Sequence, residues 1–257
     1  MWYTRCMSKK LIVGNWKMNP QSLKDAEALF KGVALATKDT KSADIVVCPP
    51  FPYLSIAKIV KTKKIKFGAQ NVSQEKEGAF TGEVSASMLA SVGVSYVIIG
   101  HSERRKAGET NEMVAKKIAQ ALKAKLLPIV CVGESVRDAH GEYLGFIKQQ
   151  IRECFSSISK AQMKSIVIAY EPIWAISSNN GRQAVPEEFT EVRIFIRKVL
   201  SDMFDSKIAH AAQILYGGSV GPDDAASFLI EGQGDGLLVG RNSLSAKKFA
   251  LVVAACK

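Results

Sequence analysis

Eight short apolar runs follow one another along this chain, and each is followed by a stretch with helical periodicity. The runs are rich in β-branched residues. In order they are Leu11–Gly14, Ile45–Cys48, Ile65–Phe67, Tyr96–Ile99, Pro128–Val132, Ile166–Ala169, Gln213–Tyr216 and Gly236–Val239. Continuous apolar strands separated by helices are typical of a parallel sheet covered by helices. The repeat therefore predicts an α/β fold made of strand–helix units.

Two of the intervening stretches show helical spacing with particular clarity. One places its apolar residues at i, i+4, i+7 and i+8, namely Val114, Ile118, Ala121 and Leu122. A second repeats one apolar face at Val192, Ile196, Val199 and Met203. Pro186 precedes this second face and is followed by Glu187 and Glu188. Proline fits the first turn of a helix, and the helix dipole favours acidic residues there, so we expect the helix to begin at Pro186.

Eight such units in 257 residues match the length of one closed (β/α)8 barrel. The alternative is an open, doubly wound sheet, which usually carries a Gly-x-Gly-x-x-Gly turn after its first strand. Here Gly14 is followed by Asn15, Trp16 and Lys17, which is not that turn. No linker rich in proline, glycine or serine divides the chain. We therefore predict a single barrel domain over residues 1–257, with residues 1–8 as an N-terminal extension and Met7 as an alternative start to Met1.

Charge and cysteine content limit the classes of function. The formal net charge is +11, which indicates a solvated, lysine-rich surface or a field that speeds capture of an anionic substrate. No nucleic-acid recognition motif accompanies the charge, so we expect no nucleic-acid partner. The five cysteines are widely spaced without a Cys-x-x-Cys pair, which argues against a disulfide framework or a zinc site. No apolar run is long enough to span a membrane, and the start lacks a signal-peptide core. We expect a cytoplasmic protein without a metal.

Chemically reactive side chains follow the predicted strands, where barrel enzymes carry their active sites. Lys17 follows the first strand, and a lysine there is more often only a surface charge. His101 follows the fourth strand and opens a predicted helix, where the dipole disfavours a charged imidazolium. Glu171 follows the sixth strand and precedes a loop, so it is a candidate general base beside a segment that could exclude water. Each residue alone is weak evidence for catalysis.

Glycine-containing loops follow the last two predicted strands. Gly217 and Gly218 precede Ser219, and Gly240 precedes Arg241. Glycines at such places let backbone N–H groups approach a phosphate, a recurrent site at this end of barrels. A tight turn is the structural alternative for each glycine. Together the two loops predict a phosphate site.

These segments as a set resemble one enzyme family, the triosephosphate isomerases. The resemblance runs from about Lys9 to the end of the chain, with the motifs in matching order and spacing. It is carried by Asn15–Asn19, Gln70–Ser73, Gly78–Glu83, Gly100–Arg105, Cys131–Glu134, Ala169–Ala175 and Tyr216–Val220. The resemblance implies a (β/α)8 TIM barrel without a cofactor. It also implies interconversion of dihydroxyacetone phosphate and D-glyceraldehyde 3-phosphate by proton transfer through an enediolate.

The same resemblance implies catalytic roles. Glu171 would move the proton between two substrate carbons, and His101 would polarise the carbonyl and handle the enediolate oxygens. Lys17 would supply positive charge for the phosphate and the developing oxyanion, and Asn15 would help to hold the enediolate. The remaining expected site residues hold the histidine and lysine or bind phosphate: Ser102 and Glu103 in the first group, and Ser177, Ser219 and the N–H groups of Gly240 and Arg241 in the second.

Family resemblance further implies a homodimer, or in some members a tetramer. Residues 70–83 resemble the loop that enters the neighbouring subunit, with Thr81 near the partner subunit's Asn15 and Lys17. Two departures from the family pattern are visible. The lid over residues 176–184 is about two residues longer than usual, with Ser177 in place of a glycine. Arg241 stands where a second glycine is common, and we expect its N–H to remain available while its side chain points to solvent.

Two other functions compete with this interpretation. A barrel with little turnover could serve as a polyanion-binding or scaffold protein, which the long lid and the +11 charge would suit. The intact Asn15, Lys17, His101 and Glu171 argue against it. Another phosphosugar isomerase or synthase would fit the two glycine-containing loops. The segments after the fourth and sixth strands do not fit that alternative.

Overall fold

The computed structural model describes residues 9–56, 64–176 and 182–256 of the chain. Within these ranges parallel strands pair in sequence order, and the last strand pairs with the first to close a barrel. The strands are β1 Lys10–Asn15, β2 Ala43–Cys48, β3 Ile65–Ala69, β4 Val94–Ile99, β5 Leu127–Val132, β6 Val167–Tyr170, β7 Gln213–Tyr216 and β8 Gly236–Val239. The closed barrel confirms the predicted fold class and excludes the open, doubly wound sheet.

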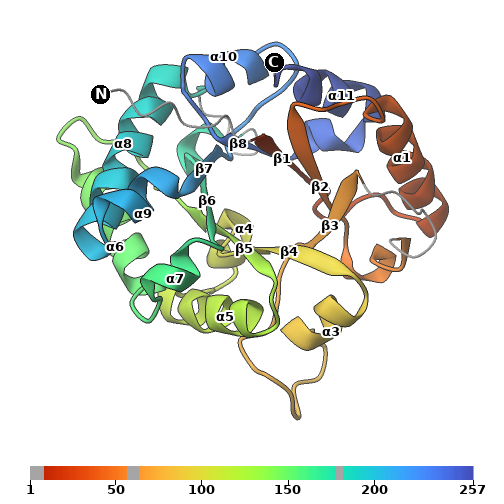
Figure 1. Ribbon diagram of the computed structural model, residues 1–257, viewed down its shortest axis with the longest axis horizontal. Coiled ribbons are helices and arrows are strands. Elements are labelled where there is room, and N and C mark those ends of the chain that lie inside the picture. The colour runs from red at the N-terminus through yellow and green to blue at the C-terminus, as the bar shows by residue number, and fades with distance from the viewer. Residues whose placement is uncertain (1–8, 57–63, 177–181, 257) are drawn as a thin grey trace.

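Helices form a ring around the strands (Figure 1). Across the described ranges they are α1 Leu23–Ala36, α3 Ala86–Ser91, α4 Ser102–Lys106, α5 Asn111–Lys123, α6 Glu142–Cys154, α7 Lys160–Met163, α8 Pro186–Met203, α9 Ser206–Ala211, α10 Ala225–Ile230 and α11 Ala246–Ala254. Short 3-10 turns follow three strands: η1 Phe51–Tyr53, η2 Ile173–Ala175 and η4 Arg241–Leu244. In the part of the chain that the structure describes, no helix is long and apolar enough to cross a membrane.

The strands lie where the apolar runs predicted them, with differences at their ends. The predicted bounds of β7 and β8 are correct, and most other strands extend beyond the apolar runs by one or two residues. The predicted start of β6 at Ile166 is wrong by one residue. Ile166 N instead donates to Met163 O (3.1 Å) and closes the turn after α7. Tyr170 continues the strand because it pairs with Val132 of β5 and Tyr216 of β7.

Two apolar layers meet at the strands. Leu11 and Val13 belong to a cluster of strand side chains that fills the barrel. Ile12, between them, belongs to the larger cluster that includes Phe30 of α1 and Phe249 of α11. Alternate side chains of a strand point to opposite faces, so each strand is buried on both. This explains why the sequence reads as continuous apolar runs.

The predicted helix faces are confirmed in α5 and α8. In α5 the side chains of Val114, Ile118 and Ala121 are buried, and in α8 the same holds for Val192 and Ile196. Burial of a valine or isoleucine side chain contributes about 1.5–3 kcal/mol. Helix α8 begins at Pro186, as expected. Because their apolar faces are buried, α5 and α8 are held mainly by packing against the rest of the barrel.

Closure of the barrel requires an unusually close approach of β8 to β1. Gly236 pairs with Leu11, and Leu11 N donates to Asp235 O (3.0 Å). A Cβ added to Gly236 would lie 1.9 Å from Leu11 O and 2.7 Å from Leu11 C. These are backbone atoms of a paired strand, and they cannot yield without separating the two strands. Glycine is therefore required at the seam of the barrel.

We predict that Gly236→Ala destabilises the fold by about 3 kcal/mol or more, since overpacking against backbone cannot relax. Gly145→Ala is the matched control, because no heavy atom lies within 4 Å of its added Cβ. Gly145 lies inside α6, so this change should stabilise the protein by roughly 0.5–1 kcal/mol. Urea unfolding at equal protein concentration compares the three proteins. Equal midpoints for Gly236→Ala and the parent would contradict the role of the seam.

Candidate active site

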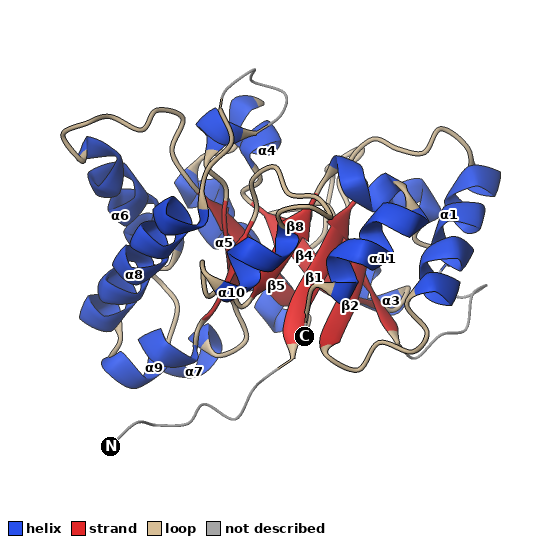
Figure 2. Ribbon diagram, turned by 90° about the horizontal axis from the view of Figure 1, so that it is seen from above, coloured by secondary structure: helices blue, strands red, loops and turns tan. Residues whose placement is uncertain are grey.

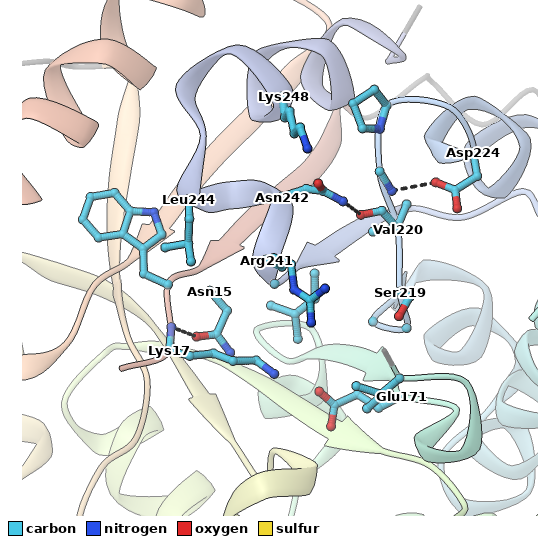
Figure 3. Close-up of a pocket in the computed structure, with 18 of the residues that line it drawn as sticks. Asn15, Lys17, Glu171, Ser219, Val220, Asp224, Arg241, Asn242, Leu244 and Lys248 are labelled. Atoms are coloured by element: carbon cyan, nitrogen blue, oxygen red, sulfur yellow. Dashed lines mark hydrogen bonds between the residues drawn. The ribbon is translucent and has the colours of Figure 1, made fainter. Parts of the chain in front are cut away.

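A cavity of about 1000 Å³ opens at the carboxyl ends of the strands. Its walls come from the segments that follow β1, β4, β6, β7 and β8, and from α11. Figure 3 shows labelled side chains that reach the cavity from the segments after β1, β6, β7 and β8 and from α11. Seven of the residues predicted for the site line this cavity: Asn15, Lys17, His101, Glu171, Ser219, Gly240 and Arg241. Ser177 lies outside the described residues.

The end of β1 holds Lys17 in a left-handed backbone conformation. Its φ is 52°, a region that residues with a Cβ seldom adopt. Lys17 N donates to Asn15 Oδ1 (3.0 Å), and Gln70 Nε2 donates to Lys17 O (2.9 Å). The same Gln70 amide group also donates to Cys48 O (2.8 Å), at the end of β2. These bonds hold the strained residue and direct its side chain into the cavity.

An ion pair joins the first and fourth segments of the site. Lys17 Nζ lies 2.6 Å from Glu103 Oε1, and both side chains are partly open to solvent. Solvent screens such a pair, so it contributes little to stability. It does partly offset the positive charge of Lys17, and it fixes where the ammonium group lies.

His101 is held as a neutral imidazole by the start of α4. It occupies the N-cap position, and Glu103 N donates to its Nδ1 atom (3.2 Å). A ring nitrogen that accepts an N–H bond carries no proton, so the ring proton is on Nε2. Nε2 lies 3.0 Å from Glu171 Oε1. His101 therefore presents an N–H donor to the cavity beside a carboxylate.

The Glu171 carboxylate is almost completely buried at the end of β6, with 2% of the residue exposed. Its Oε2 atom accepts a hydrogen bond from Ser102 N (2.9 Å) at the first turn of α4. Ser102 contacts the glutamate through its backbone, whereas the family resemblance implied a role in holding the histidine and lysine. A buried carboxylate held by two N–H donors is a candidate base for a carbon-bound proton.

Two glycines that lie beside Glu171 allow neighbouring strands to approach it. A Cβ on Gly133, after β5, would lie 1.8 Å from Glu171 O. A Cβ on Gly217, after β7, would lie 3.1 Å from Glu171 Cγ. Glu171 N donates to Val132 O (2.8 Å), which fixes its backbone at this narrow place. Glu171 is therefore positioned by contacts on both sides.

A second buried acid, Glu134, braces the segment after β6. Its Oε1 atom accepts hydrogen bonds from Tyr170 Oη (2.8 Å) and from Trp174 Nε1 (2.7 Å). Burial raises the pKa of Glu134, although these donors oppose the rise. Our sequence analysis assigned no role to this residue. A buried indole N–H needs a hydrogen-bond acceptor. Trp174 follows β6 and Glu134 follows the neighbouring strand β5, so the sequence did offer a signal that the two side chains could be bonded.

The far end of the cavity is built from the segments after β7 and β8. Asn242 Nδ2 donates to Val220 O (2.8 Å) and joins the two segments. Ser243 Oγ donates to Gly240 O (2.7 Å) and also contacts Asn15 O (3.3 Å). Neither Asn242 nor Ser243 was singled out as a functional residue from the sequence. Their bonds fix the turn that presents the Gly240 and Arg241 backbone to the cavity.

The Arg241 side chain is exposed to solvent, as expected, and it also contributes to the cavity. It lies along the wall of the cavity, between the Lys17 and Ser219 sides (Figure 3). The direction of the Arg241 side chain follows from the η4 turn. In that turn the next two side chains, Asn242 and Ser243, are held by hydrogen bonds to Val220 O and Gly240 O. The cavity therefore contains a guanidinium group that the sequence analysis did not place there.

Among the described residues, no group of three or more histidine, cysteine or acidic side chains is arranged to hold a metal ion. The chemical groups that the cavity offers are a carboxylate, an imidazole N–H, cations and backbone N–H groups. Such groups suit transfer of a proton in a bound anionic compound.

Comparison with known proteins agrees with this geometry. A family model described as triosephosphate isomerase matches residues 10–256. A protein of that name from Dictyoglomus thermophilum is 43% identical over 250 residues, covering 96% of this chain and 99% of the relative. Another from Rhodopirellula baltica is 44% identical over 253 residues, covering 97% and 98%. A third from Clostridium botulinum strain Okra is 44% identical over 250 residues, covering 96% and 99%. The chain belongs to the triosephosphate isomerase family.

Proposed function

We propose that this protein interconverts dihydroxyacetone phosphate and D-glyceraldehyde 3-phosphate. The observation that carries the proposal is the pairing of a buried carboxylate with a neutral imidazole N–H, Glu171 Oε1 and His101 Nε2 at 3.0 Å. This pair lies in a cavity that also contains a lysine and two glycine-containing loops. Near-full-length relatives named triosephosphate isomerase support the same activity.

Proton transfer begins at the carboxylate. Glu171 takes a proton from C1 of dihydroxyacetone phosphate, and the C–H electron pair becomes the second C1–C2 bond of an enediolate. His101 Nε2–H donates to the C2 oxygen as charge develops there, and a proton is then exchanged between the two oxygens. Glu171 returns its proton to C2, which gives the aldehyde. No atom is gained or lost, so the cycle needs no cofactor.

Fixed charges stabilise the enediolate in this scheme. Lys17 supplies an ammonium group close to both the phosphate and the oxyanion, and Asn15 adds an amide group. Ser219 and the N–H groups of Gly240 and Arg241 bind the phosphate at the other end of the cavity. Substrate between the two ends would exchange the direct His101–Glu171 contact for contacts with its own atoms.

We assign the protein to the cytoplasm, with no membrane or nucleic-acid partner. Cys48, Cys131, Cys154 and Cys256 are buried, free thiols, which suits a reducing compartment. The same four residues lie in different parts of the barrel, where they pack as small apolar groups. The +11 charge then acts on small phosphate esters by raising their local concentration.

We predict that Glu171→Gln lowers kcat for glyceraldehyde 3-phosphate by roughly 10²- to 10⁴-fold. An amide cannot accept the carbon-bound proton, although its oxygen can still accept the Ser102 N–H. A coupled assay measures the rate, and thermal unfolding checks that the variant is folded. Retained binding of inorganic phosphate would show an intact cavity. A kcat within about threefold of the parent would show that Glu171 is not the base.

We propose that the active form is a homodimer formed through residues 70–83. This segment projects from the barrel between β3 and α3 (Figure 1). Phe80 near its tip is 47% exposed, Met18 on the neighbouring segment is 84% exposed, and Gln74 Oε1 is buried without a hydrogen-bond partner in the described chain. Exposed apolar side chains around a projecting loop suit an interface. Entry of Thr81 into the neighbour would bring it near the partner's Lys17.

We predict that Phe80→Asp separates the subunits and lowers activity, because a buried carboxylate at the interface would lack a partner. Phe146→Asp is a close control, since Phe146 on α6 is 48% exposed and far from the loop in sequence. Sedimentation velocity and kcat are measured for both at micromolar concentration. The proposal fails if the Phe80 variant sediments like the parent, or if the parent is a fully active monomer.

A further inference from the structure

Arg241 is a cation in the cavity without an assigned function for its side chain. Within residues 9–56, 64–176 and 182–256, its guanidinium has no hydrogen-bond or ion-pair partner. The side chain extends from the η4 turn into the space between Lys17 and Ser219 (Figure 3). An unpaired guanidinium that lines a binding cavity is available to an anionic ligand.

The turn that carries Arg241 is held in place by its neighbours. Asn242 Nδ2 donates to Val220 O, and Ser243 Oγ donates to Gly240 O, so both following side chains are used in bracing the turn. Ser243 N also donates to Gly240 O (2.8 Å). The Arg241 backbone is therefore fixed while its side chain remains free to reach a ligand.

The other charged groups near the reacting end of the cavity already have partners, whereas Arg241 has none among the described residues. Lys17 is paired with Glu103, and Glu171 is held by Ser102 N and His101. Two further acids, Asp223 and Asp224, line the cavity on the segment after β7. Asp224 accepts a hydrogen bond from Gly221 N (2.6 Å), and burial raises its pKa.

Lys17 and Arg241 approach the same turn. A Cβ built on Gly240 would lie 3.7 Å from Lys17 Cε, so the lysine side chain passes directly beside Gly240. Arg241 follows Gly240 in the chain and lines the same cavity. A phosphate bound to the N–H groups of this turn would therefore have an ammonium group and a guanidinium group available to it.

We propose that the Arg241 side chain is a further ligand of the substrate phosphate, in addition to the backbone N–H groups of the turn. A guanidinium donates two parallel hydrogen bonds to a phosphate, which an ammonium group does not. Phosphate lies far from the reacting carbons, so this contact strengthens binding of substrate and transition state alike. The side chain then lowers KM and the dissociation constant of free phosphate, and leaves kcat nearly unchanged.

This proposal rests on the proposed function for the identity of the substrate. Two variants separate the effect of the positive charge of Arg241 from the effect of its planar shape. Arg241→Gln keeps much of the length and removes the charge, whereas Arg241→Lys keeps the charge and removes the planar fork. Lys198→Gln is the control for net charge, because Lys198 is exposed on α8 and does not line the cavity. Calorimetric titration with inorganic phosphate measures the dissociation constant, and the coupled assay measures KM and kcat.

For Arg241→Gln we expect about a tenfold increase in both the phosphate dissociation constant and KM, the loss typical of one charge-assisted hydrogen-bonding group. Arg241→Lys should recover part of the affinity, and Lys198→Gln should match the parent. Unchanged phosphate affinity in a folded Arg241→Gln protein would overturn the proposal, as would an equal loss in Lys198→Gln. A parent without isomerase activity would refute the proposed function alone, because the phosphate titrations still decide the role of Arg241.

Discussion

The backbone pairing of β8 with β1 is the constraint on which the molecule depends. Without it the strands would form an open sheet, and the segments after β1 and β8 would lie at opposite edges. With it, side chains far apart in the sequence line one cavity, as Lys17 and Glu171 do, and Lys17 reaches Glu103, 86 positions further along the chain. Figure 2 shows the strands in the middle of the molecule, with helices on both sides of them. The barrel can close because Gly236 has no side chain, and closure brings the groups of the cavity together.

The two glutamates of the site, Glu103 and Glu171, differ in burial and in the groups that they contact. Glu103 uses its partly exposed carboxylate to pair with Lys17 and its backbone N–H to keep His101 Nδ1 unprotonated. Glu171, by contrast, is buried, and its carboxylate lies within hydrogen-bond distance of Ser102 N and His101 Nε2. One short helix, α4, supplies the N–H groups that act on both His101 and Glu171. A five-residue element therefore orients both the imidazole and the carboxylate.

The sequence predicted the features that follow from periodicity and from local motifs. The apolar runs located the strands because every strand is buried on two faces, and Pro186 located the start of α8. Contacts between residues on neighbouring strands could not be predicted from the sequence. The support of Trp174 by Glu134, and the narrow space that requires Gly133, both depend on β5 and β6 lying side by side. The direction of Arg241 depended on a turn braced by later residues. The expectations for Ser177 and for the lid stay predictions, since residues 177–181 lie outside the described chain.

The bond from Asn242 to Val220 has a consequence for the entropy of ligand binding. It joins the two segments at the end of the cavity where we propose that phosphate binds, and Ser243 joins one of them to β1. Loops that must be ordered by a ligand cost conformational entropy, and that cost weakens the observed affinity. Here the ordering of these two segments accompanies folding of the barrel. Phosphate binding should consequently require little loss of loop freedom, so that its affinity reflects mainly the exchange of water for N–H groups and cations.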